Sequence, residues 1–214
     1  MSKIAVVDYG MGNLRSVAKA LEHVADPGVE VGITSDPEAV TAADRVVFPG
    51  QGAAGDCMAE IDNYGLRQAV LEAARTRPFL GICMGMQVLL DHSEESGGTD
   101  CLGLYRGRVR AFGRDLHDPR TLERLKIPQM GWNQVRQERS HPLWEGIGQD
   151  ERFYFVHSFY VDPEDPSLVA GTTEYGIRYA CAIGRDNVFA VQFHPEKSAD
   201  AGLRLWRNFT RLQP

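Results

Sequence analysis

Short runs of apolar residues alternate with amphipathic stretches over the first half of the chain. Apolar runs occur at residues 4–7, 29–33, 45–48 and 79–82, each close to Gly, Pro or Asp, as is typical of strands buried in a parallel sheet. After the first run, Leu14, Val17 and Leu21 recur at helical spacing, and residues 35–38 and 66–75 predict two further helices. This alternation favours an α/β fold with helices on the faces of the sheet.

The pattern changes after the polar loop at residues 93–98. Strands joined by turns are predicted at 103–112, 152–161, 168–173, 178–184 and 187–193, with a hairpin turn at 184–187. Residues 114–126 are charged and predicted to be exposed, residues 127–133 show no clear period, and Ser198 is expected to cap a last amphipathic helix. We therefore predict one domain over residues 1–214. It has a central, mostly parallel sheet flanked by helices and further antiparallel strands in its C-terminal half.

Composition and charge argue against several classes of function. The chain has 214 residues and a net charge of −6, which argues against a nucleic-acid footprint or a basic membrane-binding face. No apolar run reaches the ~18 residues of a spanning helix, and the first residues do not resemble a signal peptide. The four cysteines form no Cys-x-x-Cys pair, so we expect a reduced cytoplasmic protein without a metal or another cofactor.

The candidate nucleophile is Cys83, at the junction of a predicted strand and a predicted helix. Residues 81–85 read Gly-Ile-Cys-Met-Gly, which is the Gly-x-nucleophile-x-Gly elbow with Cys in place of Ser. Glycines at these positions allow strand and helix to approach, and the helix N-terminus favours the reactive thiolate. The alternative is that Cys83 is a small buried hydrophobic residue, as most free cysteines are.

Two other segments are predicted to lie at the same edge of the sheet as Cys83. Residues 8–10, residues 49–52 and Cys83 each follow a strand, and ligands of parallel sheets bind at the carboxyl ends of the strands. Gly50 and Gly52 allow backbone N–H groups to face a cleft, where they could stabilise an oxyanion, although an ordinary turn is an equal alternative. The Gly10/Gly12 turn lacks the remaining residues of a phosphate-binding loop.

A catalytic base is expected near the end of the last predicted strand. His194 follows residues 188–193, and in an extended chain Glu196 would project to the same side. A Cys nucleophile needs a base to take its proton and a third group to orient that base. His157 is the rival base and has no acidic residue close to it in the sequence. A surface His before a Pro is the alternative for His194.

Several of these segments resemble a known family. Residues 81–87, together with His-Pro-Glu at 194–196, resemble the signature of class I glutamine amidotransferases. Within that class, residues 8–17, the Met-Gly-Trp-Asn of residues 130–133 and the Val-His-Ser of residues 156–158 resemble the glutaminase subunits of imidazole glycerol phosphate synthases, which act in histidine biosynthesis. Gln51 replaces a more usual Val, and Phe159 replaces a more usual Tyr, which removes a hydroxyl.

The resemblance implies a set of roles. It implies that Cys83 attacks the side-chain amide of glutamine, that His194 serves as base and acid, and that Glu196 orients His194. It further implies that ammonia passes to a partner cyclase subunit, a (β/α)₈ barrel, in a heterodimer. The implied substrate-binding residues are Gly50, Gly52, Met84, Gln87, Ser158 and Phe159, and the candidate partner-facing residues are Asn13, Met130, Trp132, Asn133 and Lys197.

Three other functions stay open at this stage. A glutaminase subunit could feed a different synthase, although residues 8–17 and 130–133 argue against this. A Cys-His hydrolase of the same fold would typically carry a His directly after the nucleophile, where this chain has Met84. A binding module with an inert Cys83 is the non-enzyme alternative.

Overall fold

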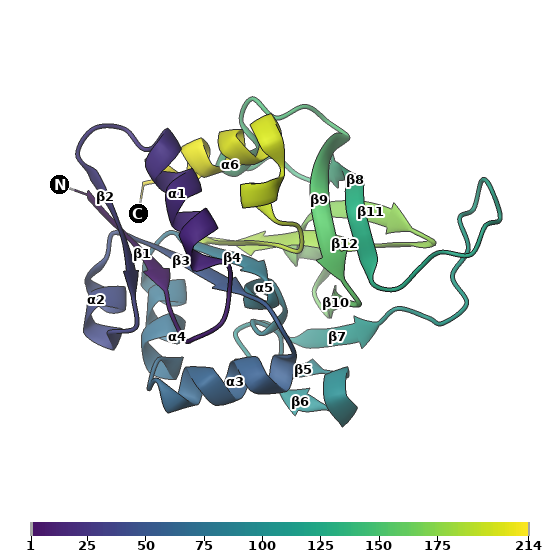
Figure 1. The fold of residues 1–214 in the computed structure, drawn as a ribbon, viewed down its shortest axis with the longest axis horizontal. Coiled ribbons are helices and arrows are strands. Elements are labelled where there is room, and N and C mark those ends of the chain that lie inside the picture. Colours follow the sequence, from purple (N-terminus) through teal and green to yellow (C-terminus); the bar gives the residue numbers. More distant parts are fainter. Residues whose placement is uncertain (1, 214) are drawn as a thin grey trace.

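The central strands of the sheet are parallel, as the apolar runs predict. The computed structural model describes residues 2–213. In the order β2-β1-β3-β4-β13, the parallel strands are β2 (Val29–Thr34), β1 (Ser2–Val7), β3 (Arg45–Gly50), β4 (Phe79–Cys83) and β13 (Val188–Val191). The last strand of the chain thus lies directly beside the strand that ends at Cys83 (Figure 1).

Helices cover both faces of this sheet. Figure 1 shows α1 (Leu14–Val24) and α6 (Ala199–Arg211) on one face, with α2 (Pro37–Ala42), α3 (Ala54–Asn63) and α4 (Arg67–Thr76) on the other. Side chains of β1 alternate between the two layers. Ile4 and Val6 join the apolar cluster under α1 and α6, whereas Ala5 and Val7 join the opposite cluster.

The C-terminal half extends the sheet with mainly antiparallel strands. From β13 the order continues through β12 (Ile177–Arg185), β10 (Phe159–Pro163), β7 (Gly107–Ala111), β5 (His92–Ser93) and β6 (Thr99–Asp100). A branch adds β11 (Val169–Tyr175), β8 (Gln129–Gln137) and β9 (Glu151–His157). The α/β fold, the additional antiparallel strands and the hairpin at residues 184–187 are confirmed.

Short turns of 3₁₀ helix complete the chain. They are η1 (Glu95–Gly97), η2 (Pro142–Trp144), η3 (Pro166–Leu168) and η4 (Pro195–Lys197). Residues 114–126 form the loop that projects at the right of Figure 1, and most of them are exposed, as predicted. Within residues 2–213 no helix has the length and apolar character needed to cross a bilayer.

Four points of the sequence analysis need correction. Helix α3 was not anticipated, and residues 127–133, which lack a clear period, contribute most of their length to β8. The helix after Cys83 is only the single turn α5 (Met84–Gln87), because the chain then bends away toward β5. Ser198 does stand at the N-cap of α6, but its side chain makes no capping bond.

Candidate active site

Cys83 lies at a sharp turn between β4 and α5. Its backbone has φ 54° and ψ −110°, a conformation that side-chain-bearing residues rarely adopt. Such strain of about 1–3 kcal/mol persists only where the surrounding packing holds it, and it is concentrated at functional sites. The side chain is nearly buried, yet it lines a cavity of about 570 Å³.

The two elbow glycines allow this turn to form. A Cβ atom on Gly85 would lie 1.9 Å from the carbonyl oxygen of Phe48, and one on Gly81 would lie 2.8 Å from the carbonyl oxygen of Gly85. Both contacts involve backbone atoms, which cannot rotate out of the way. The elbow glycines are therefore required by close backbone approach.

Strand β13 carries the second group of the site to the same cavity. Val191 pairs with Ile82 in a parallel register, so the chain after β13 emerges beside Cys83. His194 and Cys83 both line the cavity, although 111 positions separate them in the sequence (194 minus 83). Nδ1 of His194 lies 2.9 Å from Oε1 of Glu196, and both side chains are almost fully buried.

The His–Glu contact forms by a different route from the one predicted. Glu196 belongs to the turn η4, so the extended chain assumed from the spacing is wrong between these residues. Ser198 supports the turn instead of capping α6, since its hydroxyl donates to the carbonyl oxygen of His194 at 2.6 Å. The hydroxyl oxygen of Ser198 in turn accepts from the backbone N–H of Tyr154 in β9 at 3.0 Å.

The surroundings of His194 favour its charged form. Burial alone would lower the pKa of His194, but interactions with Cys83 and Glu196 outweigh burial and raise it to about 9. Because Nδ1 is bonded to Glu196, only the other ring nitrogen is left to give or take a proton. That atom, Nε2, is buried and has no completed hydrogen bond within residues 2–213. A loose Nε2 contact is common for a catalytic base before substrate binds.

His157 also lines the cavity, but both of its ring nitrogens are occupied. Nδ1 lies 2.8 Å from the carbonyl oxygen of Phe159, and Nε2 lies 3.0 Å from the hydroxyl of Tyr179. Burial lowers the pKa of His157 to about 4, so the ring is neutral at pH 7. His157 therefore fits a structural role better than that of the base.

Most of the residues expected to bind substrate line the same cavity. Its walls include Gly52, Met84, Gln87, Ser158 and Phe159. Gly50 is not among the lining residues: a Cβ atom there would lie 2.4 Å from the hydroxyl of Tyr9 and 2.8 Å from Cβ of Met84. Its missing side chain thus lets β3 and the elbow approach each other.

The sequence analysis gave no role to three residues that lie in or beside the site. Glu95 lines the cavity and accepts from the backbone N–H of Ala54 at 2.6 Å. Tyr9 is buried and donates to the carbonyl oxygen of Pro49 at 2.9 Å. Gln192 donates to Sγ of Cys83 at 3.6 Å. Only Gln192, a polar residue between apolar neighbours at the end of a predicted strand, carried a signal in the sequence.

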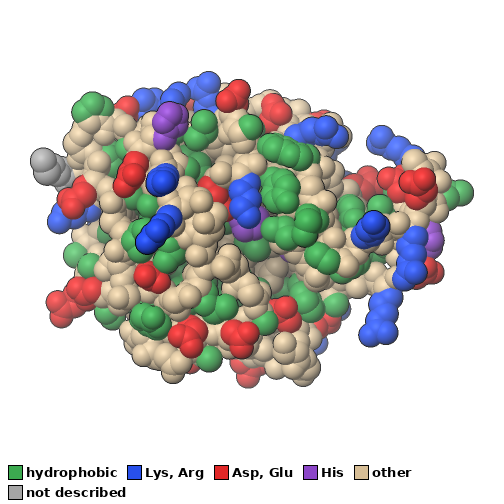
Figure 2. All heavy atoms as spheres, in the orientation of Figure 1, with side chains coloured by type: hydrophobic (Ala, Val, Ile, Leu, Met, Phe, Trp, Pro, Cys, Tyr) green, Lys and Arg blue, Asp and Glu red, His purple; other side chains and the backbone are tan. Residues whose placement is uncertain are grey.

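Three of the expected partner-facing residues, Met130, Trp132 and Asn133, lie on β8. Met130 and Trp132 are 65% and 47% exposed, and Figure 2 shows hydrophobic side chains gathered over β8 and β9. Lys197 lies near them, with Nζ 5.9 Å from the ring centroid of Tyr154, whose ring contacts Trp132 edge-on at 6.1 Å. Asn133 instead donates to the carbonyl oxygen of Glu174 at 2.8 Å.

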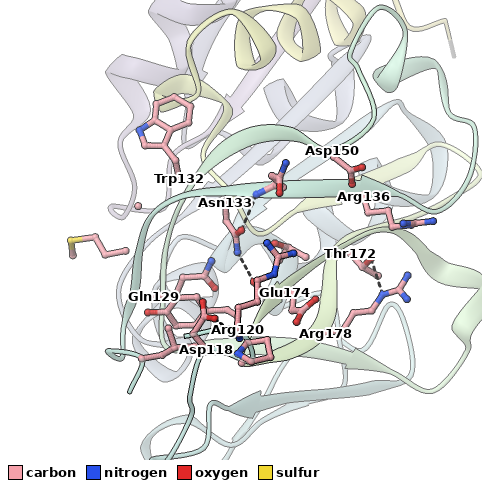
Figure 3. A pocket seen from close by; sticks show the side chains of 18 residues that line it. Asp118, Arg120, Gln129, Trp132, Asn133, Arg136, Asp150, Thr172, Glu174 and Arg178 are labelled. Carbon is pink, nitrogen blue, oxygen red and sulfur yellow. Dashed lines mark hydrogen bonds between the residues drawn. The ribbon is translucent and has the colours of Figure 1, made fainter. Parts of the chain in front are cut away.

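Asn133, together with Met130 and Trp132, lines a second hollow of about 580 Å³ between β8, β11 and the projecting loop (Figure 3). Its walls combine Arg and acidic side chains, and its lining residues include no Cys or His. Asn13, half-buried, stands at the N-cap of α1 without a side-chain capping bond. In the part of the chain that the structure describes, no group of three or more His, Cys, Asp or Glu could hold a metal ion.

Comparisons with known proteins agree with this geometry. The family model described as glutamine amidotransferase class-I matches residues 5–211. This chain belongs to the class I glutamine amidotransferases. It is 60% identical to imidazole glycerol phosphate synthase subunit HisH of Dechloromonas aromatica (strain RCB), over 99% of this chain and 97% of that relative. It is 57% identical to the protein of the same name from Aromatoleum aromaticum, with both chains covered completely.

Two solved structures share the fold of this class I chain. The structure of PurLQS from Thermotoga maritima includes a chain with a TM-score of 0.72 and 18% identity, covering 97% of each chain. A glutamine amidotransferase from the same organism has a TM-score of 0.60 and 15% identity, covering 94% of this chain and 78% of its own. At these identities the likeness extends to the fold alone.

Proposed function

We propose that the chain hydrolyses the side-chain amide of glutamine through Cys83, His194 and Glu196, as the glutaminase subunit of an imidazole glycerol phosphate synthase. The observation that carries the proposal is the shared cavity, in which a strained Cys83 meets a His194 already bonded to Glu196. The names of the relatives at 60% and 57% identity support the choice of synthase. The four free, buried cysteines fit a reducing compartment such as the cytoplasm.

The proposed reaction has two halves. In the first, Nε2 of His194 takes the thiol proton and Sγ of Cys83 attacks the amide carbon, whose oxygen becomes an anion. The anion collapses, the C–N bond breaks, and the nitrogen leaves as ammonia with the proton from His194. In the second half, His194 takes a proton from water, hydroxide attacks the thioester, and the C–S bond breaks to release glutamate.

Groups around the cavity suit each charge that this reaction creates. The raised pKa of His194 keeps its proton available for the leaving nitrogen at neutral pH. Backbone N–H groups of residues 50–52 and of Met84 are our candidates for the oxyanion. The carboxylate of Glu95 and the unpartnered Oε1 of Gln87 (unpartnered among residues 2–213) are acceptors for the substrate's ammonium group. Backbone groups of Ser158 and Phe159 complete this end of the site.

We further propose that ammonia passes to a cyclase subunit docked on the surface formed by Met130, Trp132 and Lys197. Val156 pairs with Met130 and also lines the cavity, as does Pro128, so the exposed apolar surface adjoins the reaction site. A partner there would seal the cavity from water. Free ammonia at neutral pH is mostly ammonium and a poor nucleophile, which favours direct transfer. Asn133 lies on the same strand as Met130 and Trp132, and Asn13 stands at the N-cap of α1.

The test combines labelling and assembly. An alkylating glutamine analogue should modify Cys83, as mapped by mass spectrometry, and abolish glutamine hydrolysis. Cys83→Ala should keep the fold and lose hydrolysis, whereas the control Cys101→Ala should retain it. Hydrolysis by the isolated chain should be low and rise when a candidate cyclase subunit and its ligand are added. Full activity of Cys83→Ala would refute the proposed nucleophile.

The docking surface has its own test. Trp132→Ala should weaken co-purification with the cyclase subunit by roughly tenfold or more, as for an aromatic residue at the centre of an interface. Ile33→Ala removes an apolar side chain of 40% exposure from β2 and should leave binding unchanged. Equal losses in both variants would contradict a specific surface. If no candidate cyclase subunit raises the rate of glutamine hydrolysis, the hydrolytic activity would still stand, but the assignment to this synthase would be contradicted.

A further inference from the structure

Gln192 is a buried polar residue that the proposed reaction does not yet use. It follows β13 directly, its side chain is inaccessible to solvent, and its backbone N–H donates to the carbonyl oxygen of Cys181 at 2.8 Å. Because Val191 pairs with Ile82 in parallel register, the next residues along the two strands are Gln192 and Cys83. The register therefore places the amide beside the nucleophile.

Neighbouring acceptors determine which end of the amide faces the sulfur. Nε2 of Gln87 lies 3.2 Å from the carbonyl oxygen of Phe159 and 3.0 Å from Oε1 of Gln192. A backbone carbonyl only accepts, so the NH₂ group of Gln87 must face Phe159, and the same NH₂ group then faces Gln192. Gln192 must present its oxygen to that donor. Its own NH₂ group is left facing Sγ of Cys83, 3.6 Å away.

An N–H donor at this place favours a negative sulfur. A hydrogen bond to the charged form of an acid stabilises that form, and the effect is larger where water is excluded. Sγ is anionic twice in the proposed reaction, before it attacks the amide and when it leaves the thioester. The amide of Gln192 exchanges no proton, so it can stabilise the sulfur in both steps while His194 carries the proton.

We infer that Gln192 is a catalytic residue whose amide donates a hydrogen bond to Sγ of Cys83, and that Gln87 holds the amide in this orientation. The role in catalysis rests on the proposed function. The contact itself does not, and it can be measured without any substrate.

The experiment measures the rate of alkylation of Cys83 by iodoacetamide between pH 5 and pH 10 on the full chain, with the modified site mapped by mass spectrometry. The other thiols interfere little, because burial raises the pKa of Cys57 to about 12, that of Cys101 to about 11, and that of Cys181 further still. Gln192→Met removes the donor at similar volume. Gln192→Glu keeps the acceptor for Gln87 but faces the sulfur with a carboxylate.

We expect the alkylation midpoint of Q192M to rise by about one pH unit, so that alkylation near neutral pH falls roughly tenfold. The midpoint of Q192E should rise further, because its carboxylate repels the sulfur anion. In both variants kcat for glutamine hydrolysis should fall by at least the same factor. The control Gln68→Met changes an exposed glutamine of α4 and should match the unaltered chain.

Alkylation profiles of Q192M and Q192E that superpose on that of the unaltered chain would overturn the inference. If Q192M does not fold, Q192E decides alone, since it preserves the shape and the contact with Gln87. If the alkylation profile of the variants is shifted but the unaltered chain hydrolyses no glutamine, the proposed function is contradicted and the hydrogen bond is supported. Normal glutamine hydrolysis together with an unshifted alkylation profile would contradict the hydrogen bond and leave the proposed function intact.

Discussion

The hydroxyl of Ser198 donates a 2.6 Å hydrogen bond to the carbonyl oxygen of His194. Ser198 also accepts from the backbone N–H of Tyr154, while the N–H of His194 donates to the carbonyl oxygen of Tyr154 at 2.9 Å. One buried side chain thus links β9 to the turn that carries the proposed base. A residue that resembles a helix cap in the sequence holds the turn of the proposed base instead.

Ser198→Ala is expected to lower both stability and turnover. The substitution leaves the N–H of Tyr154 without its acceptor, which costs roughly 1–3 kcal/mol of unfolding free energy. With His194 less firmly held, kcat for glutamine should fall while KM changes little. Urea unfolding and steady-state kinetics measure the two effects. Ser140→Ala, on an exposed loop, is the control, and a loss of the same size there would contradict the role of Ser198.

Cys83→Gly is expected to unfold with a higher free energy than Cys83→Ala, although neither variant hydrolyses glutamine. Glycine adopts the positive φ of 54° without strain, whereas alanine keeps the strain of the native turn. The difference should be about 1 kcal/mol after the greater chain entropy of glycine is subtracted. Chemical denaturation of both variants gives the difference directly. A glycine variant less stable than the alanine variant would mean that the turn stores no strain.

Glu196→Gln should change how stability depends on pH. In the native chain the pKa of His194 is raised from 6.5 to about 9. The native state therefore binds the proton more tightly than the unfolded state. This stabilisation is complete below pH 6.5 and is lost as the pH rises toward 9. Removing the carboxylate should abolish part of that dependence, on the order of 1–3 kcal/mol.

Urea unfolding of the unaltered chain and of Glu196→Gln at pH 6 and pH 9.5 measures this effect. The unaltered chain should have the larger advantage at pH 6, and the gap should narrow at pH 9.5. A gap that is independent of pH would show that Glu196 does not stabilise the charged imidazole.

Gly85→Ala should prevent normal packing of the elbow. The new Cβ would lie 1.9 Å from the carbonyl oxygen of Phe48, so β3 and α5 would have to separate. We expect a loss of more than roughly 3 kcal/mol, at the upper end of single-residue effects. The matched control is Gly32→Ala in β2, where a Cβ meets nothing within 4 Å, and its thermal midpoint should change little. A thermal midpoint of Gly85→Ala equal to that of Gly32→Ala would contradict the close approach between Gly85 and Phe48.

Several elements were predictable because their signals are local. The apolar runs of the parallel strands and the Gly-x-Cys-x-Gly turn depend on residues that are neighbours in the sequence. Helix α3 was missed because it follows a Gly-rich stretch and itself contains Gly55. Strand β8 was missed because Met130 and Trp132 are large, apolar and exposed, which obscures the alternation of a half-buried strand.

The sequence by itself determined the α/β class, and it predicted Cys83 as the candidate nucleophile and the pair His194–Glu196 as a candidate base with its partner. Each of these depends on periodicity or on spacings of a few residues. Tertiary structure alone decided which histidine can take a proton. His157 and His194 line one cavity, but Tyr179 and the carbonyl of Phe159 occupy His157, while Nε2 of His194 has no completed bond within the described chain.

Tertiary structure also decided the contact between Gln192 and Cys83, which follows from the pairing of β13 with β4. Hydrogen bonds between distant segments depend on strand order and register. Strand order is set by how the whole apolar surface packs, and no spacing within one segment records it.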